Sequence, residues 1–405
     1  MAKKTKANKK TGSKGASVKK DSRKKRTKKK TKPRKVAKKK QTSTHKVKAV
    51  DESAPITLME ARKAISPARA KATKKSARRG KSSKSKKATT VEDIARKRKG
   101  RDRELRSERE QRVKDFKAIM SLMKRRGVKG LGSEGPEVKG GGTFAMTSNR
   151  RGIRSTANTP LQILAEGDSW FDYPVPLFGG GIIPRLEDLL GVPILNLAKA
   201  GDEVRSMLGV EARKILTKHL KSGSPAGGDW DVLLFSGGGN DIVGESMALW
   251  VREFDSSVPP AKLINQPRFE NVLKIVKAGY EDLIKLRNSH SPNSQLIFHS
   301  YDFAIPDGRG ICFLGPWMKP TFDIRNFKTR APASKVVKAM LQQFAQMLES
   351  IERRHSKVTF INTQGTLRAS TNSWHNELHP SEKGFQQFAK IFHKEIRSVF
   401  PDRVL

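Results

Sequence analysis

Apolar residues after about residue 159 fall into five short runs that are typical of buried strands. The runs are Leu161–Ala165, Pro193–Ala198, Val232–Ser236, Gln295–His299 and Lys357–Asn362. A short continuous apolar run between turn residues fits a strand that is covered on both faces, as in a parallel sheet. We therefore expect five buried strands in this part of the chain.

Helical patterns lie between and after these runs, with apolar residues three and four positions apart. They cover Ile183 to Leu190, Glu203 to His219, Arg268 to Ser289, Ser334 to His355 and Ser381 to Phe400. Strands that alternate with helices form parallel sheets through right-handed crossovers. The pattern predicts an α/β fold over residues 159–405, a three-layer α/β/α sandwich with a parallel, flavodoxin-like sheet.

The first 150 residues follow a different pattern. They contain 52 of the 84 Lys and Arg residues but 13 of the 39 Asp and Glu residues, so they carry +39 of the formal net charge of +45. Lysine tracts at this density repel one another and leave too few large apolar side chains for a core. We expect a disordered basic tail over residues 1–90, which resembles the lysine-rich tails of linker histones in composition only.

Two further segments separate this tail from the α/β domain. Acidic residues reappear over residues 91–126, which predicts a charged helix with a narrow apolar stripe. The stripe consists of Val113, Phe116, Met120 and Met123. It either packs on the protein's own domain or binds a partner. Residues 127–158 are rich in glycine and are expected to form a flexible linker.

Cysteine content and hydropathy indicate in which cellular compartment the protein is expected. Cys312 is the only cysteine, which excludes an intramolecular disulfide and a cysteine-based zinc site. The basic N-terminus is not followed by the apolar segment of a signal peptide, and no run approaches the roughly 20 apolar residues of a membrane span. We expect a cytoplasmic protein, with association with the nucleoid as a further option, and no metal or other cofactor is implied.

Three polar motifs carry the candidate chemistry. A Gly-Asp-Ser tripeptide ends at Ser169, a glycine-rich run ends in Asn240 and Asp241, and His379 precedes a proline near the C-terminus. Loops that leave the carboxyl ends of parallel strands share one edge of the sheet, so we expect these motifs to meet. A serine nucleophile needs an adjacent base, and histidine is suited to that task near neutral pH.

With these residues, the chain resembles the SGNH, or GDSL, hydrolase family over roughly residues 160–400. The family has four sequence blocks, matched here by Gly167-Asp168-Ser169, Gly201, Gly238-Gly239-Asn240-Asp241 and Asn376-Glu377-Leu378-His379-Pro380. The resemblance implies an ester hydrolase without a cofactor, in which Ser169 is the nucleophile and His379 the base. It also implies an oxyanion hole formed by the backbone N–H of Ser169, the backbone N–H of Gly201 and the side chain of Asn240.

The fourth block departs from the family pattern. The family has an acid three residues before the histidine, which orients the imidazole and stabilises its charged form. Here Asn376 occupies that position and brings no charge. Three alternatives stay open: a Ser–His dyad assisted by Asn376 or by a backbone carbonyl, an acid supplied by the adjacent Glu377, and an inactive site. Asp168 and Asp241 are expected to order their loops rather than to form a catalytic pair.

Two interpretations of function follow. The first is a serine hydrolase that cleaves carboxylic esters, acyl or acetyl, through an acyl-Ser169 intermediate, while residues 1–126 bind nucleic acid by neutralising phosphates without reading sequence. The alternative is a nucleic-acid-binding protein whose hydrolase-like domain is an inactive scaffold. Residues 243–266 and 301–330 are long connections that we expect to shape the substrate pocket.

Overall fold

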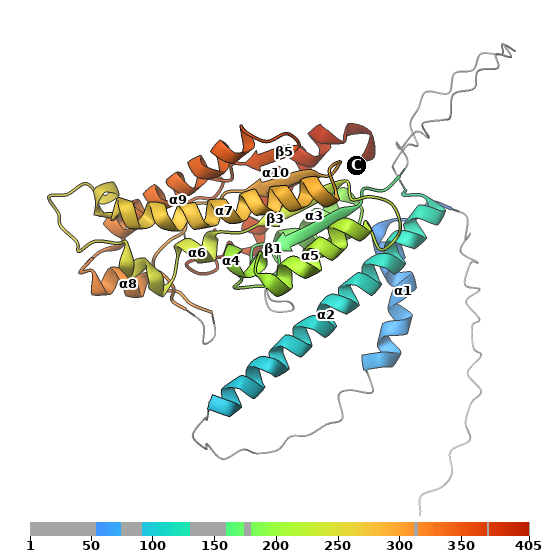
Figure 1. The fold of residues 1–405 in the computed structure, drawn as a ribbon, viewed down its shortest axis with the longest axis horizontal. Coiled ribbons are helices and arrows are strands. Elements are labelled where there is room, and N and C mark those ends of the chain that lie inside the picture. Colours follow the sequence, from blue (N-terminus) through green and yellow to red (C-terminus); the bar gives the residue numbers. More distant parts are fainter. Residues whose placement is uncertain are drawn as a thin grey trace, which may run out of the picture. The chain divides into compact units, whose positions relative to one another are not determined.

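The computed structural model describes residues 54–73, 91–129, 159–173, 180–311, 315–370 and 372–404. Its centre is a five-stranded parallel sheet (Figure 1). The strands are β1 (Ile163–Gly167), β2 (Ile194–Asn196), β3 (Val232–Ser236), β4 (Gln295–His299) and β5 (Val358–Ile361), in the spatial order β2-β1-β3-β4-β5. This is the flavodoxin-like order, and it confirms the predicted fold class.

Helices flank the sheet. They are α3 (Ile182–Leu190), α4 (Val204–Met207), α5 (Val210–Ser222), α6 (Gly239–Ile242), α7 (Gln266–His290), α8 (Lys319–Ile324), α9 (Arg330–Glu352) and α10 (Glu382–Val399). Short 3-10 helices lie at Glu245–Leu249, Pro260–Leu263 and Pro401–Arg403. Helix α3 packs on α10, and α7 packs on both α5 and α9. Because parallel crossovers are right-handed, these two groups cover opposite faces of the sheet.

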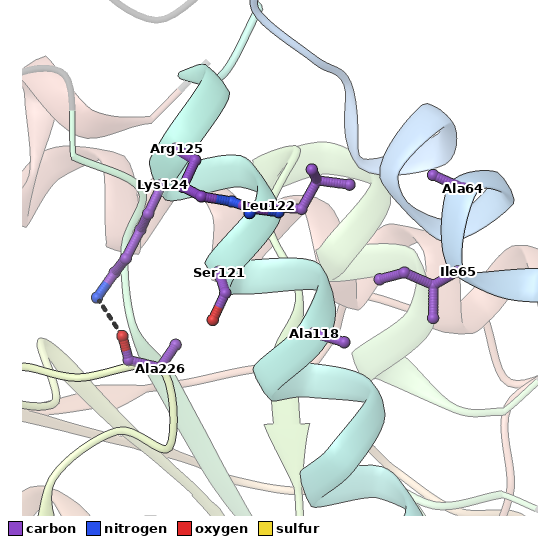
Figure 2. A pocket seen from close by; sticks show the side chains of 8 residues that line it. All are labelled: Ala64, Ile65, Ala118, Ser121, Leu122, Lys124, Arg125 and Ala226. Atoms are coloured by element: carbon purple, nitrogen blue, oxygen red, sulfur yellow. Dashed lines mark hydrogen bonds between the residues drawn. The ribbon is translucent and has the colours of Figure 1, made fainter. Parts of the chain in front are cut away.

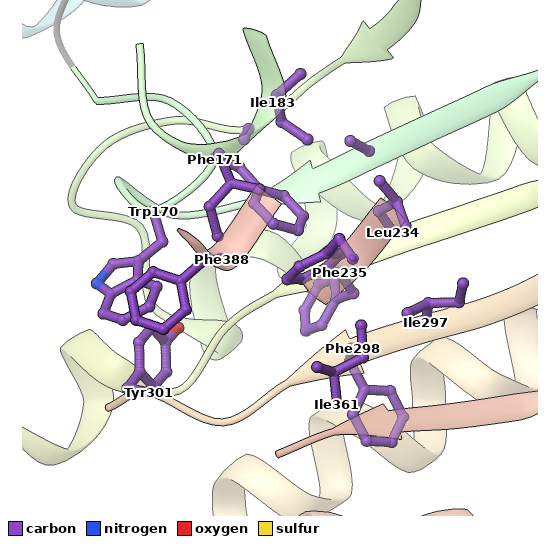
Figure 3. Packing of buried hydrophobic residues seen from close by; sticks show 14 of the residues in the cluster. Trp170, Phe171, Ile183, Leu234, Phe235, Ile297, Phe298, Tyr301, Ile361 and Phe388 are labelled. Carbon is purple, nitrogen blue, oxygen red and sulfur yellow. The ribbon is translucent and has the colours of Figure 1, made fainter. Parts of the chain in front are cut away.

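The sheet is buried on both faces, as its apolar runs predicted. Neighbouring side chains along a strand alternate between the two faces, so Leu234 and Phe235 enter different layers of the core (Figure 3). Phe298 and Phe388 belong to the same cluster of buried apolar residues. Each fully buried side chain of this size contributes about 1.5–3 kcal/mol relative to exposure. The strand ends therefore form a rigid edge for the loops that leave them.

Two helices precede the α/β domain in sequence, α1 (Leu58–Thr73) and α2 (Val91–Arg126). Helix α2 lies beside β2 and buries Phe116, Met120 and Met123 of the apolar stripe, with Val113 half-buried, as expected for packing on the protein's own domain. The ring of Phe116 is 5.7 Å from that of Trp230, between centroids. Helix α1 contacts α2, and its Arg62 forms an ion pair with Glu187 of α3.

These contacts change the expected organisation before residue 159. We expected an extended tail up to residue 90, but residues 58–73 are a helix. The buried face of α2 agrees with the first of the two roles expected for the apolar stripe, packing on the protein's own domain. The rest of the expected tail, residues 1–53 and 74–90, and most of the expected linker, residues 130–158, lie outside the described residues.

Candidate active site

Ser169 lies in the turn that directly follows β1. The carbonyl oxygen of Asp168 accepts hydrogen bonds from Phe171 N (3.1 Å) and Asp172 N (3.0 Å), which closes the turn. Gly167 is required at the end of β1, because a Cβ there would lie 2.7 Å from the carbonyl oxygen of Ser236 in β3. The close approach of the two strands thus presents Ser169 at the carboxyl edge of the sheet, 8% exposed.

His379 meets Ser169 from the loop before α10. Its Nε2 is 2.6 Å from Ser169 Oγ. The indole N–H of Trp170 donates to the carbonyl oxygen of Leu378 (3.1 Å), which links the serine turn to the histidine loop. The imidazole stacks on the ring of Tyr173, with 4.3 Å between centroids. Burial, with a smaller effect of the neighbouring His375, lowers the pKa of His379 to about 3. The imidazole is therefore neutral at neutral pH, and its lone pair can accept a proton.

Asn376 holds the other side of this imidazole. Its Oδ1 accepts hydrogen bonds from Leu378 N and His379 N, both at 2.9 Å. Backbone N–H groups only donate, so the atom that faces them must be the amide oxygen. The same Oδ1 is 3.0 Å from His379 Nδ1, which must then carry the proton. The Nδ2 of Asn376 donates to the hydroxyl of Tyr173 (3.1 Å). The amide therefore selects the tautomer in which Nε2 faces Ser169 without a proton.

Glu377 points away from the histidine. Its carboxylate is fully buried and accepts four backbone hydrogen bonds at 2.6–3.0 Å, from Gly308, Trp317, Met318 and Lys319. It thereby fastens the loop before α8. This loop brings the ring of Trp317 to 5.8 Å from that of His379, edge to face. The structure places Asn376 next to the imidazole of His379 and Glu377 where it anchors the loop before α8.

The two other candidate oxyanion donors lie in adjacent loops at the same edge. Asn240 is in the first turn of α6, directly after β3, and its Nδ2 donates to the carbonyl oxygen of Asp202 (2.9 Å). This contact fastens the loop that contains Gly201, whose φ of 84° favours glycine. Asp241 fastens the same loop further on, because its carboxylate accepts from Val204 N (2.9 Å). Burial raises the pKa of Asp241 to about 6.

Asp168 orders the serine turn from inside the core, as expected from sequence. Its Oδ1 accepts from Trp170 N and from the hydroxyl of Ser236, both at 2.9 Å, and its Oδ2 accepts from the hydroxyl of Tyr301. Ser236 also contacts Nε2 of His299 (2.9 Å). Burial raises the pKa of Asp168 to about 6. Sequence reasoning missed Ser236 and His299, although a polar residue ending each of two otherwise apolar strands was the available signal.

A small cavity of about 30 Å³ adjoins the candidate site. It is lined by Asp168, Ser169, Trp170, Gly239, Asn240, Val243, Tyr301, Asp302, Ala304, Leu341 and Leu378. Both long connections that were expected to shape the pocket contribute to it, through Val243 and through Tyr301, Asp302 and Ala304. Phe313, one of the aromatic residues in the second connection, lies outside the described residues, and Phe322 and Phe327 pack against each other, 4.9 Å between ring centroids.

A larger, open groove of about 750 Å³ lies elsewhere, between α1, α2 and the turn at Ala226 (Figure 2). Its lining residues are Ala64, Ile65, Ala118, Ser121, Leu122, Lys124, Arg125 and Ala226, and none of them is a candidate catalytic residue. The groove is therefore separate from the candidate site at Ser169. Within the described residues, no three His, Cys, Asp or Glu side chains gather as metal ligands. The helices described here include none that is both long and apolar enough to cross a membrane.

Comparison with known families agrees with this geometry. A model described as the GDSL-like lipase/acylhydrolase family matches residues 167–387, which is more than half of the chain. The chain belongs to this family. Membership assigns the protein to the ester hydrolases as a broad class.

Solved structures of similar proteins come from several sources. The lipase Lip_vut3 from a goat rumen metagenome is 17% identical, with a TM-score of 0.39 over 58% of this chain and 96% of that one. An extracellular lipase from Streptomyces rimosus is 14% identical, with a TM-score of 0.38 over 58% and 99%. The inhibitor-bound aryl esterase of M. smegmatis is 12% identical, with a TM-score of 0.37 over 59% and 99%. No curated protein matches the sequence.

Proposed function

We propose that this protein hydrolyses carboxylic esters through an acyl-Ser169 intermediate, with His379 as general base and without a carboxylate as third member. The observation that supports the proposal most is the 2.6 Å contact between Ser169 Oγ and His379 Nε2. The Nδ1 proton of the same ring is held by Asn376. A nucleophile, a base and a group that orients the base are the elements that acyl transfer needs.

The proposed reaction has two halves. Ser169 Oγ attacks the acyl carbon while its proton passes to His379 Nε2, and His379 then gives this proton to the departing alcohol. In the second half, His379 takes a proton from water as the hydroxide attacks the acyl-serine, and it then gives this proton to Ser169 Oγ as the acid leaves. The oxyanion of each tetrahedral intermediate would accept N–H bonds from Ser169, Gly201 and Asn240. Asn240 has a second N–H for this purpose, since one donates to Asp202.

Asn376 is compatible with this mechanism for a specific reason. Replacing a triad aspartate by asparagine costs about 10⁴ in kcat when the amide N–H faces the imidazole and imposes the wrong tautomer. Here the two backbone N–H groups of Leu378 and His379 turn the amide oxygen toward Nδ1. The tautomer is therefore the productive one, and only the stabilisation of the imidazolium by a charge is lost.

The size of the cavity supports a short acyl group. The cavity of about 30 Å³ is small beside the roughly 300–1,000 Å³ of pockets that hold drug-sized ligands. Val243, Ala304, Leu341 and Leu378 contribute apolar side chains to the wall. We propose an acetyl or similarly short acyl ester as substrate. Hydrolysis of p-nitrophenyl esters should then be fastest for acetate and fall as the acyl chain lengthens to octanoate.

The test of the proposal is reaction of the purified protein with a fluorophosphonate probe, together with turnover of p-nitrophenyl acetate. The wild type should be labelled at Ser169, and Ser169→Ala should lose both label and turnover while keeping its circular dichroism spectrum. Ser206→Ala is the matched control, because Ser206 is exposed on α4. Turnover at the wild-type rate in Ser169→Ala would end the assignment of the nucleophile.

We further propose that the basic N-terminal region binds nucleic acid in the cytoplasm. Its support is the net charge of +39 in residues 1–150. Within α2, Arg109, Arg112 and Lys124 contact the α/β domain, so the charges available to a polyanion lie mainly before residue 91. The alternative function, a nucleic-acid-binding protein with an inactive scaffold, is favoured by the neutral Asn376. Failure of Ser169 to react with the fluorophosphonate would favour this alternative.

A further inference from the structure

We infer that helix α2 belongs to the catalytic module and that Arg112 is a positioning residue. It keeps the serine turn and the loop of Gly201 in fixed positions relative to each other. The inference rests on the proposed function. It extends that function to a helix that precedes residue 167, where the match to the family begins. Three sets of contacts support it.

The first set joins Arg112 to the serine turn. Its Nη2 is 2.9 Å from Oδ1 of Asp172, and the two side chains form an ion pair. The backbone N–H of Asp172 donates to the carbonyl oxygen of Asp168 (3.0 Å), so Asp172 closes the turn that contains Ser169. The guanidinium is therefore attached to the turn three residues after the nucleophile.

The second set joins α2 to the segment before Gly201. Arg112 Nη1 donates to the carbonyl oxygens of Asn196 and Ala198, both at 3.2 Å. Arg109, one helical turn earlier, donates to the carbonyl oxygen between them, that of Leu197. Three consecutive carbonyl groups at the end of β2 are thus bound by two guanidinium groups. The loop that presents Gly201 starts from these residues.

The third set fixes α2 itself. Phe116, Met120 and Met123 are buried against the α/β domain, and Glu108 accepts a hydrogen bond from Arg112 Nη2 (2.8 Å). The guanidinium is thus aimed at the two loops. A planar guanidinium can donate in several fixed directions at once, whereas an ammonium group acts as a compact point charge. Arginine is therefore the residue that can bridge a carboxylate and two carbonyl oxygens here.

A second hydrogen bond between the loops limits the effect expected from the loss of Arg112. Asn196 Nδ2 donates to the carbonyl oxygen of Phe171 (3.1 Å), and this contact does not involve α2. Loss of Arg112 should therefore allow the two loops to move relative to each other without separating them. Displacement of reacting groups by about 1 Å can cost roughly 10²-fold in rate. We expect Arg112→Ala to lower kcat about 10- to 100-fold, with KM changed by less than about threefold, because Arg112 does not line the cavity.

The experiment uses the full chain in five forms: wild type, Arg112→Ala, Arg112→Lys, Asp172→Asn and the control Arg106→Ala, which removes an exposed arginine from the same helix. Turnover of p-nitrophenyl acetate gives kcat and KM, and amide hydrogen exchange is followed in peptides that cover residues 168–173 and 197–204. Added guanidinium ion should restore part of kcat in Arg112→Ala but not in Asp172→Asn. Arg112→Lys should be intermediate, and Arg106→Ala should match the wild type.

Faster exchange in both peptides of Arg112→Ala, together with the fall in kcat, would support the inference. If Arg112→Ala is active at the wild-type rate, or exchanges at the wild-type rate, the inference is overturned. If it does not fold, Asp172→Asn decides in the same way, because it removes the ion pair between Arg112 and the serine turn and leaves α2 unchanged. If the wild type neither reacts with fluorophosphonate nor hydrolyses esters, the proposed function fails, and exchange alone then shows whether Arg112 holds the two loops.

Discussion

At the scale of single residues, the identity of the group beside His379 is decided by contacts that the sequence does not display. The sequence left Asn376 and Glu377 as alternatives, because they are neighbours in the same block. Four backbone N–H groups from residues 308–319 bind the carboxylate of Glu377. They lie about sixty residues away along the chain, so no local pattern could have indicated this. The proximity of Ser169 and His379 was predictable because both lie on loops at the carboxyl edge of a parallel sheet, whereas their catalytic roles were implied by the family resemblance.

Asn376→Asp should change the pH dependence of hydrolysis. The active form of His379 is neutral, and its pKa of about 3 means that the wild type stays in this form down to about pH 4. A carboxylate at position 376 favours the imidazolium, so it raises the pKa of His379 toward its ordinary value near 6.5. When kcat/KM is measured as a function of pH, the variant should lose activity at a higher pH than the wild type as the solution is acidified.

At neutral pH the same variant should be as active as the wild type or more active, because the new charge stabilises the imidazolium in the transition state. Burial raises the pKa of Asp168 to about 6 in both proteins, so the comparison uses the difference between their acidic limbs. Asn376→Ala serves as the control, since it removes the acceptor of the Nδ1 proton and should lower kcat. Identical acidic limbs in the wild type and Asn376→Asp would show that residue 376 does not act on His379.

Asn240→Ala should lower kcat by about 10²–10³, which is the usual effect of losing one oxyanion donor. The variant also loses the hydrogen bond to Asp202, so its hydrogen exchange over residues 199–204 should be compared with that of the wild type. Asn271→Ala, at an exposed position of α7, is the matched control. A change in kcat of less than about threefold would remove Asn240 from the oxyanion hole.

At the scale of elements, the strands were predictable and the connections less so. The apolar runs predicted β3 and β4 with the bounds that the structure has, because strands covered on both faces leave a continuous signal. The helical pattern predicted from Glu203 to His219 is instead two helices, α4 and α5, which are separated at Leu208 and Gly209. Asp241 of α6 binds the N-terminus of α4 through Val204 N, and this tertiary contact has no signal in the helical periodicity.

The loop anchored by Glu377 gives a prediction at this scale. Glu377→Gln replaces one acceptor oxygen by an amide N–H₂ group, which then faces backbone N–H donors. Because the site is fully buried, we expect destabilisation on the order of 2–4 kcal/mol, seen as a lower urea midpoint. The acidic limb of the pH profile should not move, since the carboxylate is not next to His379. An unchanged midpoint together with a shifted limb would show instead that Glu377 is the triad acid.

At the scale of the whole molecule, the boundary of the basic region and the boundary of the packed structure fall at different places in the chain. The basic charge extends through residue 150, but α2 packs beside β2 and α1 packs on α2. The apolar stripe indicated that α2 could pack on the domain, but not that its arginines take part, because arginines that bind carbonyl groups look the same as solvated arginines. Arg109 and Arg112, one turn apart beside the apolar stripe, were the available signal. A deletion up to residue 150 would therefore remove both the basic segment and the α2 side chains that are buried against the α/β domain.

A cut before residue 54 separates the two roles. Residues 1–53 contain 23 Lys and Arg residues and three acidic residues, and they precede every contact of α1 and α2 described above. Their removal should weaken binding to duplex DNA and reduce the salt dependence, since log K falls by about 0.9 per decade of salt for each phosphate neutralised. Ester hydrolysis should be unchanged, because Arg112 and the buried stripe remain. Labelled duplexes of two unrelated sequences, titrated at several salt concentrations, measure the first effect, and p-nitrophenyl acetate measures the second.

A full-length chain with residues 1–53 scrambled is the control, and it should bind like the wild type because phosphate neutralisation depends on charge rather than on order. Binding lost on scrambling, or a strong preference for one duplex, would contradict an electrostatic tether.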